Sequence, residues 1–290
     1  MNEADVKFDR IAVLGLGLLG GSVAAAARRS GIAHSIVGAT RNSDANAFAL
    51  ERGWVDSVGS PAEAVEGADL VVLATPIYAM ADLLRSFSTS LRDGAIVTDV
   101  GSVKAHLAET LPGLLPNGVF YVGSHPMAGS HARGIEYASQ ELFDGSTCIV
   151  TGTPGTAESD SVCAFWSALG ARLVMRTPDE HDAEVAWTSH VPHALAFVFA
   201  SAFGSSPAGA RQAVGAGFRD FTRIANSDPE LWSDILTANR KAITGPLAEV
   251  AETLAELGRA VESNDTEAVE RTIASARVAL AGMVPGEDQD

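Results

Sequence analysis

The feature that most constrains the fold is a glycine triplet near the amino terminus. The stretch RIAVLGLGLLGGSVAAAARRSG runs from an apolar strand, Ile11 to Leu14, through Gly15, Gly17 and Gly20 into an alanine-rich helix expected to stop near Gly31. In G-x-G-x-x-G between strand and helix, the first glycine allows a tight turn. The second lets a pyrophosphate approach the backbone, and the third lets helix pack on strand. Since the amino end of that helix faces the phosphates, the stretch predicts dinucleotide binding.

Apolar strands alternate with helical patterns over the first part of the chain. The segments interpreted as strands are HSIVGAT, ADLVVLATP, GAIVTDVGS, VFYVGSHP, STCIVTG and ARLVMRT. This alternation predicts an α/β fold of the Rossmann type, with a parallel sheet covered on both faces. Ligands bind beyond the carboxyl ends of the strands in such sheets. Three strand ends should therefore converge on one crevice, at Thr75 and Pro76, at Gly101 and Ser102, and at Ser124 and His125.

His125 stands in VGSHPMAGS, directly before a proline. The residue before a proline is pushed out of helical geometry, which predicts a strand end or a loop for His125. A histidine in a turn can do no more than satisfy a local hydrogen bond. Its place at one of three converging strand ends favours a functional side chain instead.

The end of the second strand bears on the cofactor. An acidic residue about 20 positions after the glycines would accept a hydrogen bond from the 2′-hydroxyl of NAD. Here the sequence is VGATRNS, with Thr40 at that position and Arg41 after it. An arginine can pair with the 2′-phosphate of NADP, whereas a carboxylate would repel it. The sequence predicts NADP in preference to NAD, the alternative being that Arg41 is a solvated loop residue.

The pattern becomes helical after about residue 177, with long apolar segments and no evident strand. We expect a domain boundary near Arg176, with a dinucleotide-binding domain over 8–176 and an all-α domain over 177–283. His190 and His193 are three residues apart and share a helix face. A zinc site is disfavoured because the H-E-x-x-H arrangement and a third ligand are missing, so no metal is predicted. A core histidine and an anion-binding histidine both remain open.

A second pair of cationic side chains follows in GFRDFTRIANSDPELW, where Arg219 and Arg223 are one turn apart. The residues Ser227, Asp228 and Pro229 then signal the start of a helix. In an acidic chain, two arginines on one face are either partners of Asp and Glu or a clamp for a carboxylate.

Composition excludes several classes of partner. The formal net charge is −16, which argues against nucleic acid and anionic membrane as partners, because phosphate binding needs a basic surface. The two cysteines, Cys148 and Cys163, lack metal-ligand spacing and indicate reduced thiols. The acidic first residues do not resemble a signal peptide, and no apolar run reaches the ~20 residues of a membrane span. We therefore expect a cytoplasmic protein.

These motifs together resemble the prephenate and arogenate dehydrogenase family of tyrosine biosynthesis, over roughly residues 9 to 283. The resemblance rests on GLGLLGGS, DVGSVK, GSHPMAG, TSHVPH and GFRDFTRIANSDPELW, in that order. The glycine motif is shared with many dehydrogenases, whereas the last four together are specific. The resemblance implies a nucleotide-binding domain followed by a helical domain that forms a homodimer. It also implies oxidative decarboxylation of prephenate, a cyclohexadienol, to 4-hydroxyphenylpyruvate with hydride transfer to NADP or NAD.

The resemblance also implies residue roles. His125 accepts the proton of the ring hydroxyl, a task that suits a neutral imidazole near pH 7. Ser102 orients the same hydroxyl, and Arg223 and His193 hold the carboxylates of the small-molecule substrate, with Arg219 as a helper. Ser124 and His131 complete the predicted substrate contacts. The predicted cofactor contacts are Gly15, Gly17, Leu18, Leu19, Gly20, Thr40, Arg41, Thr75, Pro76 and Ser102.

One departure from the family concerns substrate choice. His131 stands after HPMAG, where many members carry an acidic or amide residue. A histidine supplies no carboxylate for the ammonium of arogenate, so we expect prephenate to be preferred. The alternatives are arogenate, the 4-amino-4-deoxy analogue of prephenate and, from another class, an NADP-sensing regulator without turnover. The presence of Ser102, His125 and Arg223 together argues against the regulator.

Overall fold

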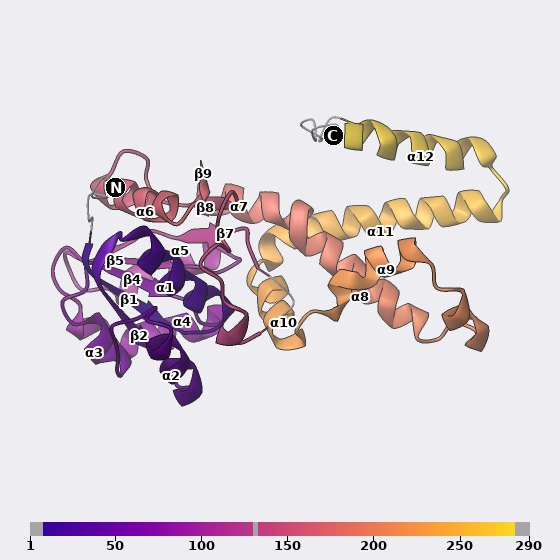
Figure 1. Ribbon diagram of the computed structural model, residues 1–290. Helices are drawn as coiled ribbons and strands as arrows, with labels where there is room; N and C mark the ends of the chain where they lie inside the picture. The colour runs from indigo at the N-terminus through magenta and orange to yellow at the C-terminus, as the bar shows by residue number, and fades with distance from the viewer. Residues whose placement is uncertain (1–7, 130–132, 282–290) are drawn as a thin grey trace. The chain divides into compact units, whose positions relative to one another are not determined.

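The computed structural model describes residues 8–129 and 133–281, and strands occupy only the first part of the chain (Figure 1). The nine strands within these residues are β1 (Phe8–Leu14), β2 (Ala33–Ala39), β3 (Ser57–Val58), β4 (Leu70–Leu73), β5 (Ile96–Asp99), β6 (Phe120–Tyr121), β7 (Ser124–Pro126), β8 (Thr147–Val150) and β9 (Arg172–Met175). Every segment predicted as a strand contains strand residues, and the described residues after Met175 form none. His131 lies outside the described residues.

Six strands form one parallel sheet in the order β3-β2-β1-β4-β5-β6. This is the strand order of a Rossmann sheet, in which the chain crosses from one half to the other beside β1. Helix α1 (Leu18–Ser30) follows β1 and ends at Gly31, whose φ of 66° is left-handed, as the sequence predicts. The predicted α/β fold class is confirmed.

The sheet is covered on both faces, and the alternation of side chains along β1 shows how. Ile11 and Val13 belong to one apolar cluster, together with side chains of α1, α2 (Ser43–Glu51) and α6 (Ala157–Ala168). Ala12 and Leu14 belong to the other cluster, together with side chains of α3 (Pro61–Val65), α4 (Ile77–Phe87) and α5 (Ala105–Thr110). Because successive residues of a strand point to opposite faces, a run that is apolar throughout is what a doubly covered sheet requires.

The stretch VFYVGSHP is not the single strand that its composition predicts. It divides at Val122 and Gly123 into β6, the edge of the six-stranded sheet, and β7, which starts a second sheet of order β7-β8-β9. A Cβ on Gly123 would lie 2.6 Å from Oγ1 of Thr151, so only glycine fits where the chain passes β8. Strand β7 is antiparallel to β8, which corrects the expectation of a wholly parallel sheet. Ser124 and His125 therefore lie within a strand and not beyond the end of one.

Helices follow the strands in the first part of the chain and continue alone after Met175. The α-helices are α1 (Leu18–Ser30), α2 (Ser43–Glu51), α3 (Pro61–Val65), α4 (Ile77–Phe87), α5 (Ala105–Thr110), α6 (Ala157–Ala168), α7 (Pro178–Val185), α8 (Val191–Phe203), α9 (Ala216–Thr222), α10 (Pro229–Ala238), α11 (Arg240–Glu262) and α12 (Thr266–Ala281). Short 3₁₀ turns cover Ser88–Ser90, Pro112–Leu114, Ile135–Tyr137, Ala208–Ala213 and Arg223–Asn226. As predicted, Asp228 caps α10, accepting a hydrogen bond from the Leu231 amide at 2.8 Å.

Helices α7 and α8 are joined without a loop by one π-helical stretch, Ala186–His190. Pro192 stands in the first turn of α8, so it has no amide to donate to the preceding turn and its ring would crowd the carbonyl four residues earlier. The wider π turn accommodates this proline. Such turns occur preferentially at functional sites, and this one carries His190 at its end.

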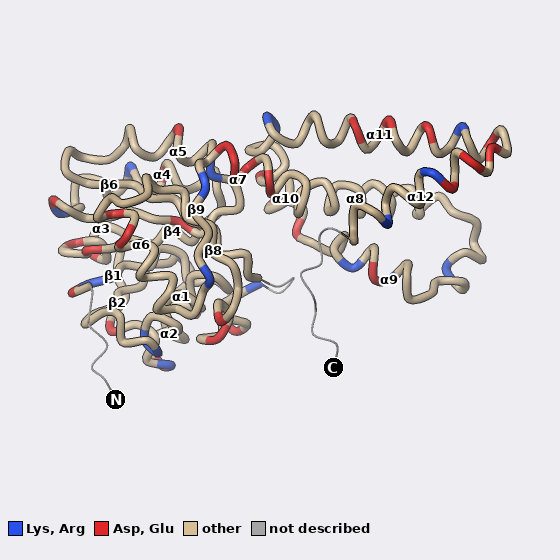
Figure 2. Tube along the Cα trace, turned by 90° about the horizontal axis from the view of Figure 1, so that it is seen from above, with Lys and Arg blue, Asp and Glu red and all other residues tan. Residues whose placement is uncertain are grey.

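Contacts divide the chain into one compact unit that ends at Ala242 and a second that begins at Ile243. The predicted boundary near Arg176 remains a prediction. In the second unit, acidic positions recur along α11 (Figure 2). Large apolar side chains are also exposed there, at Leu254, Val261, Ile273, Val278 and Leu280. None of the helices over the described residues is long and apolar enough to cross a membrane.

Candidate functional site

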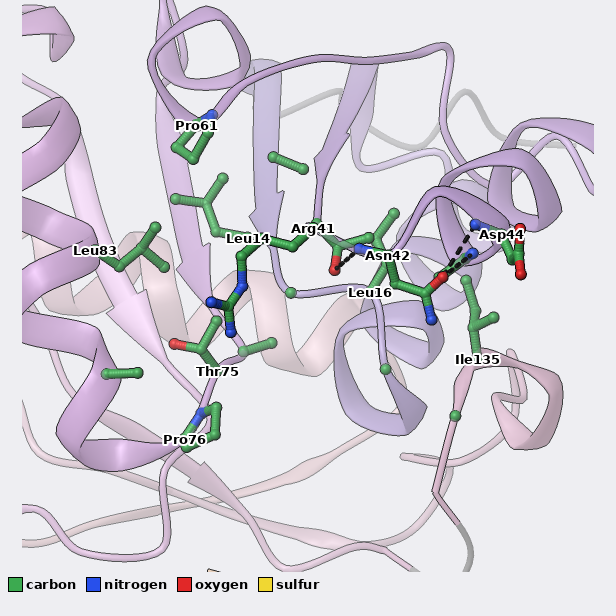
Figure 3. A pocket seen from close by; sticks show the side chains of 18 of the residues that line it. Leu14, Leu16, Arg41, Asn42, Asp44, Pro61, Thr75, Pro76, Leu83 and Ile135 are labelled. Atoms are coloured by element: carbon green, nitrogen blue, oxygen red, sulfur yellow. Dashed lines mark hydrogen bonds between the residues drawn. The ribbon is translucent and has the colours of Figure 1, made fainter.

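A pocket of about 980 Å³ lies at the carboxyl ends of β1, β2 and β4 (Figure 3). It is lined by six of the residues predicted to contact the cofactor, namely Gly15, Gly17, Thr40, Arg41, Thr75 and Pro76. Leu18 and Leu19 form the first turn of α1 beside it. The fold therefore brings these predicted residues and this helix end to one pocket.

The glycine turn has the geometry that each glycine was expected to provide. Gly15 has a φ of 101°, and a Cβ there would lie 2.4 Å from the carbonyl oxygen of Ala74. A Cβ on Gly20 would lie 1.8 Å from the Gly15 carbonyl oxygen, so the helix packs on the turn only without a side chain. A Cβ on Gly17 would meet nothing within 4 Å, because Gly17 faces the open pocket.

These residues fit a dinucleotide. Gly17 precedes the first turn of α1 and no side chain caps it, which leaves the amide-bearing end of a 13-residue helix directed at the pocket. Such an end favours phosphate through its amides and its dipole. Thr75 Oγ1 is buried and has no partner among the described residues, as expected of a hydroxyl that bonds to a ligand.

The end of β2 is held by the helix that follows it. Asn42 caps α2 by accepting hydrogen bonds from the amides of Asp44 and Ala45, at 3.0 and 3.2 Å. The Asn46 amide donates to the carbonyl of Thr40 at 3.0 Å. Arg41 extends into the pocket in Figure 3 and makes no ion pair within the described part of the chain. Asp44 also lines the pocket, and Figure 3 draws Asn42 between the two side chains.

A segment that the sequence did not suggest covers part of this pocket. Gly134, Ile135 and Glu136 line it, and the 3₁₀ turn that begins at Ile135 packs on α1 and α2. A Cβ on Gly21 would lie 2.9 Å from Ile135, so the second glycine of the pair in GLLGGS makes room for this turn. That requirement adds to the three glycines of the motif.

His125 lies in β7 with only 9% of its surface exposed. Its Nδ1 is 2.8 Å from Nε2 of His181, on α7, with the rings 5.1 Å apart in an edge-to-face arrangement. Burial, reinforced by the nearby His181, Lys104 and His190, lowers the pKa of His125 well below the usual histidine value. The imidazole is therefore neutral near pH 7 and able to accept a proton.

His181 is fully buried and continues the contact to Asp182. The distance from His181 Nδ1 to Asp182 Oδ1 is 2.8 Å. The same carboxylate accepts the backbone amides of Lys104 and Ala105 at the start of α5, at 2.7 and 3.0 Å. Burial lowers the pKa of His181, although Asp182 opposes this. Helix α7 is thereby fixed to the loop that follows β5.

A second buried network surrounds the backbone of β7. Lys104 is fully buried, forms an ion pair with Asp99 and donates to the carbonyl of Ser124 at 2.8 Å. The Tyr121 hydroxyl donates to the other Asp99 oxygen at 2.7 Å, and its pKa is raised by burial and then by Asp99. A buried pair that is bonded on both sides fixes geometry. Here it holds the ends of β5, β6 and β7 together.

The predicted substrate contact at Ser124 does not fit the bonds that its hydroxyl makes. The side chain is fully buried, donates to the carbonyl of Asp99 and accepts from Nε1 of Trp166 at 2.9 Å. The hydroxyl of Thr98 lies 2.9 Å away as well. A hydroxyl with three partners has no hydrogen-bonding position left for a ligand. Ser124 therefore anchors β7, and the neighbouring His125 is the candidate functional residue of this strand.

Ser102 is half-buried in the loop after β5, two residues before Lys104. The turn is held by the Gly101 amide, which donates to Asp99 Oδ1 at 2.7 Å. Ser102 does not line the nucleotide pocket, in contrast to Thr75 and Pro76. The loop is held at both ends, because the Gly101 amide donates to Asp99 and the Lys104 amide donates to Asp182.

His190 and His193 are used differently although they share a helix. His190 is buried, and its Nδ1 lies 2.9 Å from the Asn239 side-chain nitrogen, which also donates to the carbonyl of Asp182 at 3.0 Å. Burial lowers the pKa of His190 to about 4. His193 donates from Nδ1 to the carbonyl of Ser189 at 2.8 Å and stacks on the indole of Trp232.

The two arginines lie at the exposed end of α9. Arg219 donates to the carbonyl of Val214 at 3.0 Å, and Arg223 begins the 3₁₀ turn that packs on α8. An ion pair between Arg133 and Asp228 joins the segment before the pocket-lining turn to the cap of α10. No three His, Cys, Asp or Glu side chains in the described residues are arranged to hold a metal ion.

The sequence motifs do not identify several of these residues. His181, Asp182 and Asn239 lie in no recognisable motif, and 56 positions separate His181 from His125, which it contacts. Lys104 and Trp232 lie within DVGSVK and SDPELW but had been given no role. Their positions at the ends of those motifs were the available signal.

Comparison with known proteins gives two matching family models. The nucleotide-binding domain of prephenate dehydrogenase matches residues 23–175, and its dimerization domain matches residues 177–275. A prephenate dehydrogenase of Lactococcus lactis is 30% identical over 90% of this chain and 73% of its own. A cyclohexadienyl dehydrogenase of Zymomonas mobilis is 33% identical over 89% and 90%. A 4-amino-4-deoxyprephenate dehydrogenase of Streptomyces pristinaespiralis is 29% identical over 87% and 84%.

Solved structures agree with the fold. Prephenate dehydrogenase from A. aeolicus, in complex with hydroxyphenyl propionate and NAD+, superposes with a TM-score of 0.88 at 29% identity over 97% of this chain and 100% of that one. Synechocystis arogenate dehydrogenase gives a TM-score of 0.80 at 30% identity over 95% and 100%. The names of these relatives differ in substrate, and all of them are named dehydrogenases.

Proposed function

The chain belongs to the prephenate dehydrogenase family, and on that premise we propose that it converts prephenate and NADP+ to 4-hydroxyphenylpyruvate, carbon dioxide and NADPH. His125 carries this proposal. It is a buried imidazole, neutral near pH 7, on the strand that follows the parallel sheet of the nucleotide pocket. A neutral imidazole in that setting can take the proton of a carbinol hydroxyl.

The protein's part in the chemistry is positioning and one proton. The bound nicotinamide supplies the hydride acceptor. His125 takes the proton of the ring hydroxyl as the carbinol carbon becomes a carbonyl. It returns the proton to the same oxygen after carbon dioxide has departed and the ring has become aromatic. The overall reaction therefore releases no proton. Ser102, on the loop between the Asp99 and Asp182 contacts, orients that hydroxyl, and the fixed ends of its loop support this role.

The substrate carboxylates are assigned to the helical part of the first unit. Arg223 and His193 hold them, with Arg219 as a helper one turn away. Support comes from the packing of the Arg223 turn on α8, the helix that carries His193. A guanidinium and an imidazole are the cationic groups suited to two carboxylates, and the chain needs such a local cluster because its net charge is −16.

NADP is the proposed preferred cofactor. Thr40 replaces the acidic residue that would bond to the 2′-hydroxyl of NAD, and Arg41 reaches into the same pocket. A guanidinium pairs well with a 2′-phosphate. Asp44 is an opposing charge in the pocket lining, and Figure 3 draws Asn42 between it and Arg41. The NAD+ complex of the A. aeolicus enzyme leaves NAD as the second cofactor to test.

Prephenate is the proposed substrate because His131 supplies no carboxylate for the ammonium of arogenate. The experiment is to follow reduced cofactor with NADP+ and NAD+ on adding prephenate, arogenate or 4-amino-4-deoxyprephenate, with wild type and His131→Glu. We expect the highest kcat/KM with prephenate and NADP+, and a shift of the ratio toward arogenate in the variant. A preference for the amino analogue would make the chain a counterpart of the Streptomyces relative. Tight NADP binding without turnover on any substrate would make it a regulator.

A homodimer formed by the helical part of the chain is also proposed. The match to a dimerization domain and the exposed apolar side chains of α8 and α9, Val198, Phe199 and Phe221, support it. The exposed apolar residues of α11 and α12 support it further. Exposed apolar side chains on helices are typical of an interface. Sedimentation of the full chain at several concentrations tests this, and a monomer throughout would contradict it.

A further inference from the structure

The contacts behind His125 set the direction of a chain of hydrogen bonds. Both oxygens of Asp182 accept backbone amides, from Lys104 at 2.7 Å and from Ala105 at 3.0 Å. The carboxylate therefore acts as the acceptor at this point, and the ring nitrogen that faces it, His181 Nδ1 at 2.8 Å, carries a proton. The start of α5 thus fixes which nitrogen of His181 is protonated.

The tautomer of His181 determines that of His125. A neutral imidazole that donates from Nδ1 has only a lone pair at Nε2. His181 Nε2 is 2.8 Å from His125 Nδ1, so His125 must donate there. Its other nitrogen, Nε2, then holds the lone pair. Both rings are buried, and burial keeps each of them neutral by lowering its pKa.

We propose that His181, held by Asp182, is a positioning residue that sets the ring orientation and the tautomer of His125, so that Nε2 of His125 receives the substrate's hydroxyl proton. The inference rests on the proposed function, and it adds a residue that does not touch the substrate. The hydroxyl O–H bond breaks as the His125 Nε2–H bond forms. The imidazolium then donates from Nδ1 to a neutral acceptor, which stabilises the charge.

The charged groups around the two rings are known. His125 is influenced by His181, Lys104 and His190. His181 is influenced by Lys104, Asp182 and Asp99. Of these, only Asp182 touches the ring of His181 and only His181 touches the ring of His125 through its nitrogens in the described structure. The tautomer therefore depends on this pair and not on the charge of Lys104.

The test combines kinetics with nitrogen NMR of enzyme labelled in histidine, the His125 signals being assigned by loss in His125→Gln. In the wild type we expect a protonated Nδ1 and an unprotonated Nε2 on His125. His181→Phe, which keeps a ring but removes the acceptor, should lower kcat by about 10- to 100-fold, the range found for residues that orient metal-ligating histidines. The KM for prephenate should change little, and the His125 tautomer should become mixed.

His181→Gln restores an acceptor near the lost Nε2 and should recover part of kcat. His34→Phe, at an exposed histidine, is the control and should behave as wild type. A wild-type His125 that carries its proton on Nε2 would overturn the proposal, as would an unchanged kcat and tautomer in His181→Phe. The NMR result on the wild type needs no substrate and does not depend on the folding of His181→Phe. A chain inactive on prephenate would therefore refute the proposed function without deciding the tautomer.

Discussion

The imidazole of His193 is stacked on the indole of Trp232, with ring centroids 3.8 Å apart and ring planes inclined by 23°. Trp232 also meets the edges of His190 and Phe197, and lies on α10 beside the second apolar cluster. Stacking on the indole face holds the imidazole of His193 in one orientation. Trp232 thus orients a residue of the proposed carboxylate site.

Trp232→Leu should raise the KM for prephenate several-fold while kcat falls less, because the stack positions His193 and takes no part in the proton transfer. Trp232→Phe keeps an aromatic face and should lie close to the wild type. Steady-state kinetics of both variants, with thermal unfolding to monitor the loss of a large side chain, measures the difference. Equal KM values in the three enzymes would separate the stack from substrate binding.

Arg41→Ala should weaken NADP+ binding by about 1.5 to 3 kcal/mol, the usual value of a hydrogen bond to a charged group. The effect on NAD+ should be small, because NAD+ has no phosphate to pair with the guanidinium. Titration of each cofactor, by calorimetry or by tryptophan fluorescence, gives both affinities. Arg172→Ala, which removes an exposed arginine of β9 outside the pocket, is the matched control. Parallel losses for the two cofactors would place Arg41 away from the 2′-position.

The nucleotide half of the molecule could be predicted from the sequence, because its signals are local. Each apolar run lies between turn residues, and the order of the strands makes neighbours of the segments that carry Gly15, Arg41 and Thr75. The break at Gly123 was not predictable in the same way. VFYVGSHP has the composition of one strand, and only the contact of Gly123 with Thr151, the residue directly after β8, accounts for the break.

The support of His125 could not be predicted, for a related reason. His181 and Asp182 are adjacent on a polar helix, and nothing local distinguishes them from solvated residues. Their role follows from the docking of α7 against the start of α5, a tertiary contact between segments 77 and 78 residues apart. Ser124 is the opposite case. Its position in the motif predicts a contact with a ligand, but the side chain is buried and its hydroxyl accepts a hydrogen bond from Trp166.

His125→Ala should lower kcat by about 10²- to 10⁴-fold, the range for loss of a general base, with a much smaller change in the KM for prephenate. Arg223→Ala should do the reverse, raising KM chiefly, because a carboxylate contact is made in the ground state as well. Comparing the two variants under saturating NADP+ separates catalysis from binding. Near-normal turnover in His125→Ala would return this histidine to a structural role.

The pH profile follows from the environment of His125. Burial holds its pKa well below the usual value of 6.5, and the base is active in its neutral form. Activity should therefore rise with pH through the lowered pKa and be level across the neutral range. In kcat/KM for prephenate the acid limb is expected below pH 6.5, after correction for unfolding. A limb centred at or above 6.5 would mean that the titrating base is a solvated histidine.

Stability should also decrease in acid, and His190 allows the contribution to be isolated. Burial lowers the pKa of His190 to about 4 in the folded chain, whereas the unfolded chain has the usual value of 6.5. Above pH 6.5 both states are neutral and the group has no effect. As the pH falls from 6.5 to about 4, the unfolded state takes up the proton first, so up to about 3 kcal/mol of stability is lost.

His190→Asn keeps an acceptor for the Asn239 side chain, 2.9 Å from the ring, but cannot titrate there. Its unfolding free energy, from urea denaturation at a series of pH values, should fall less steeply over that range than that of the wild type. His34→Asn removes an exposed histidine and should leave the wild-type slope unchanged. If His190→Asn and wild type lost stability in parallel, the acid sensitivity would have to come from other buried groups, with His125 and His181 the next to replace.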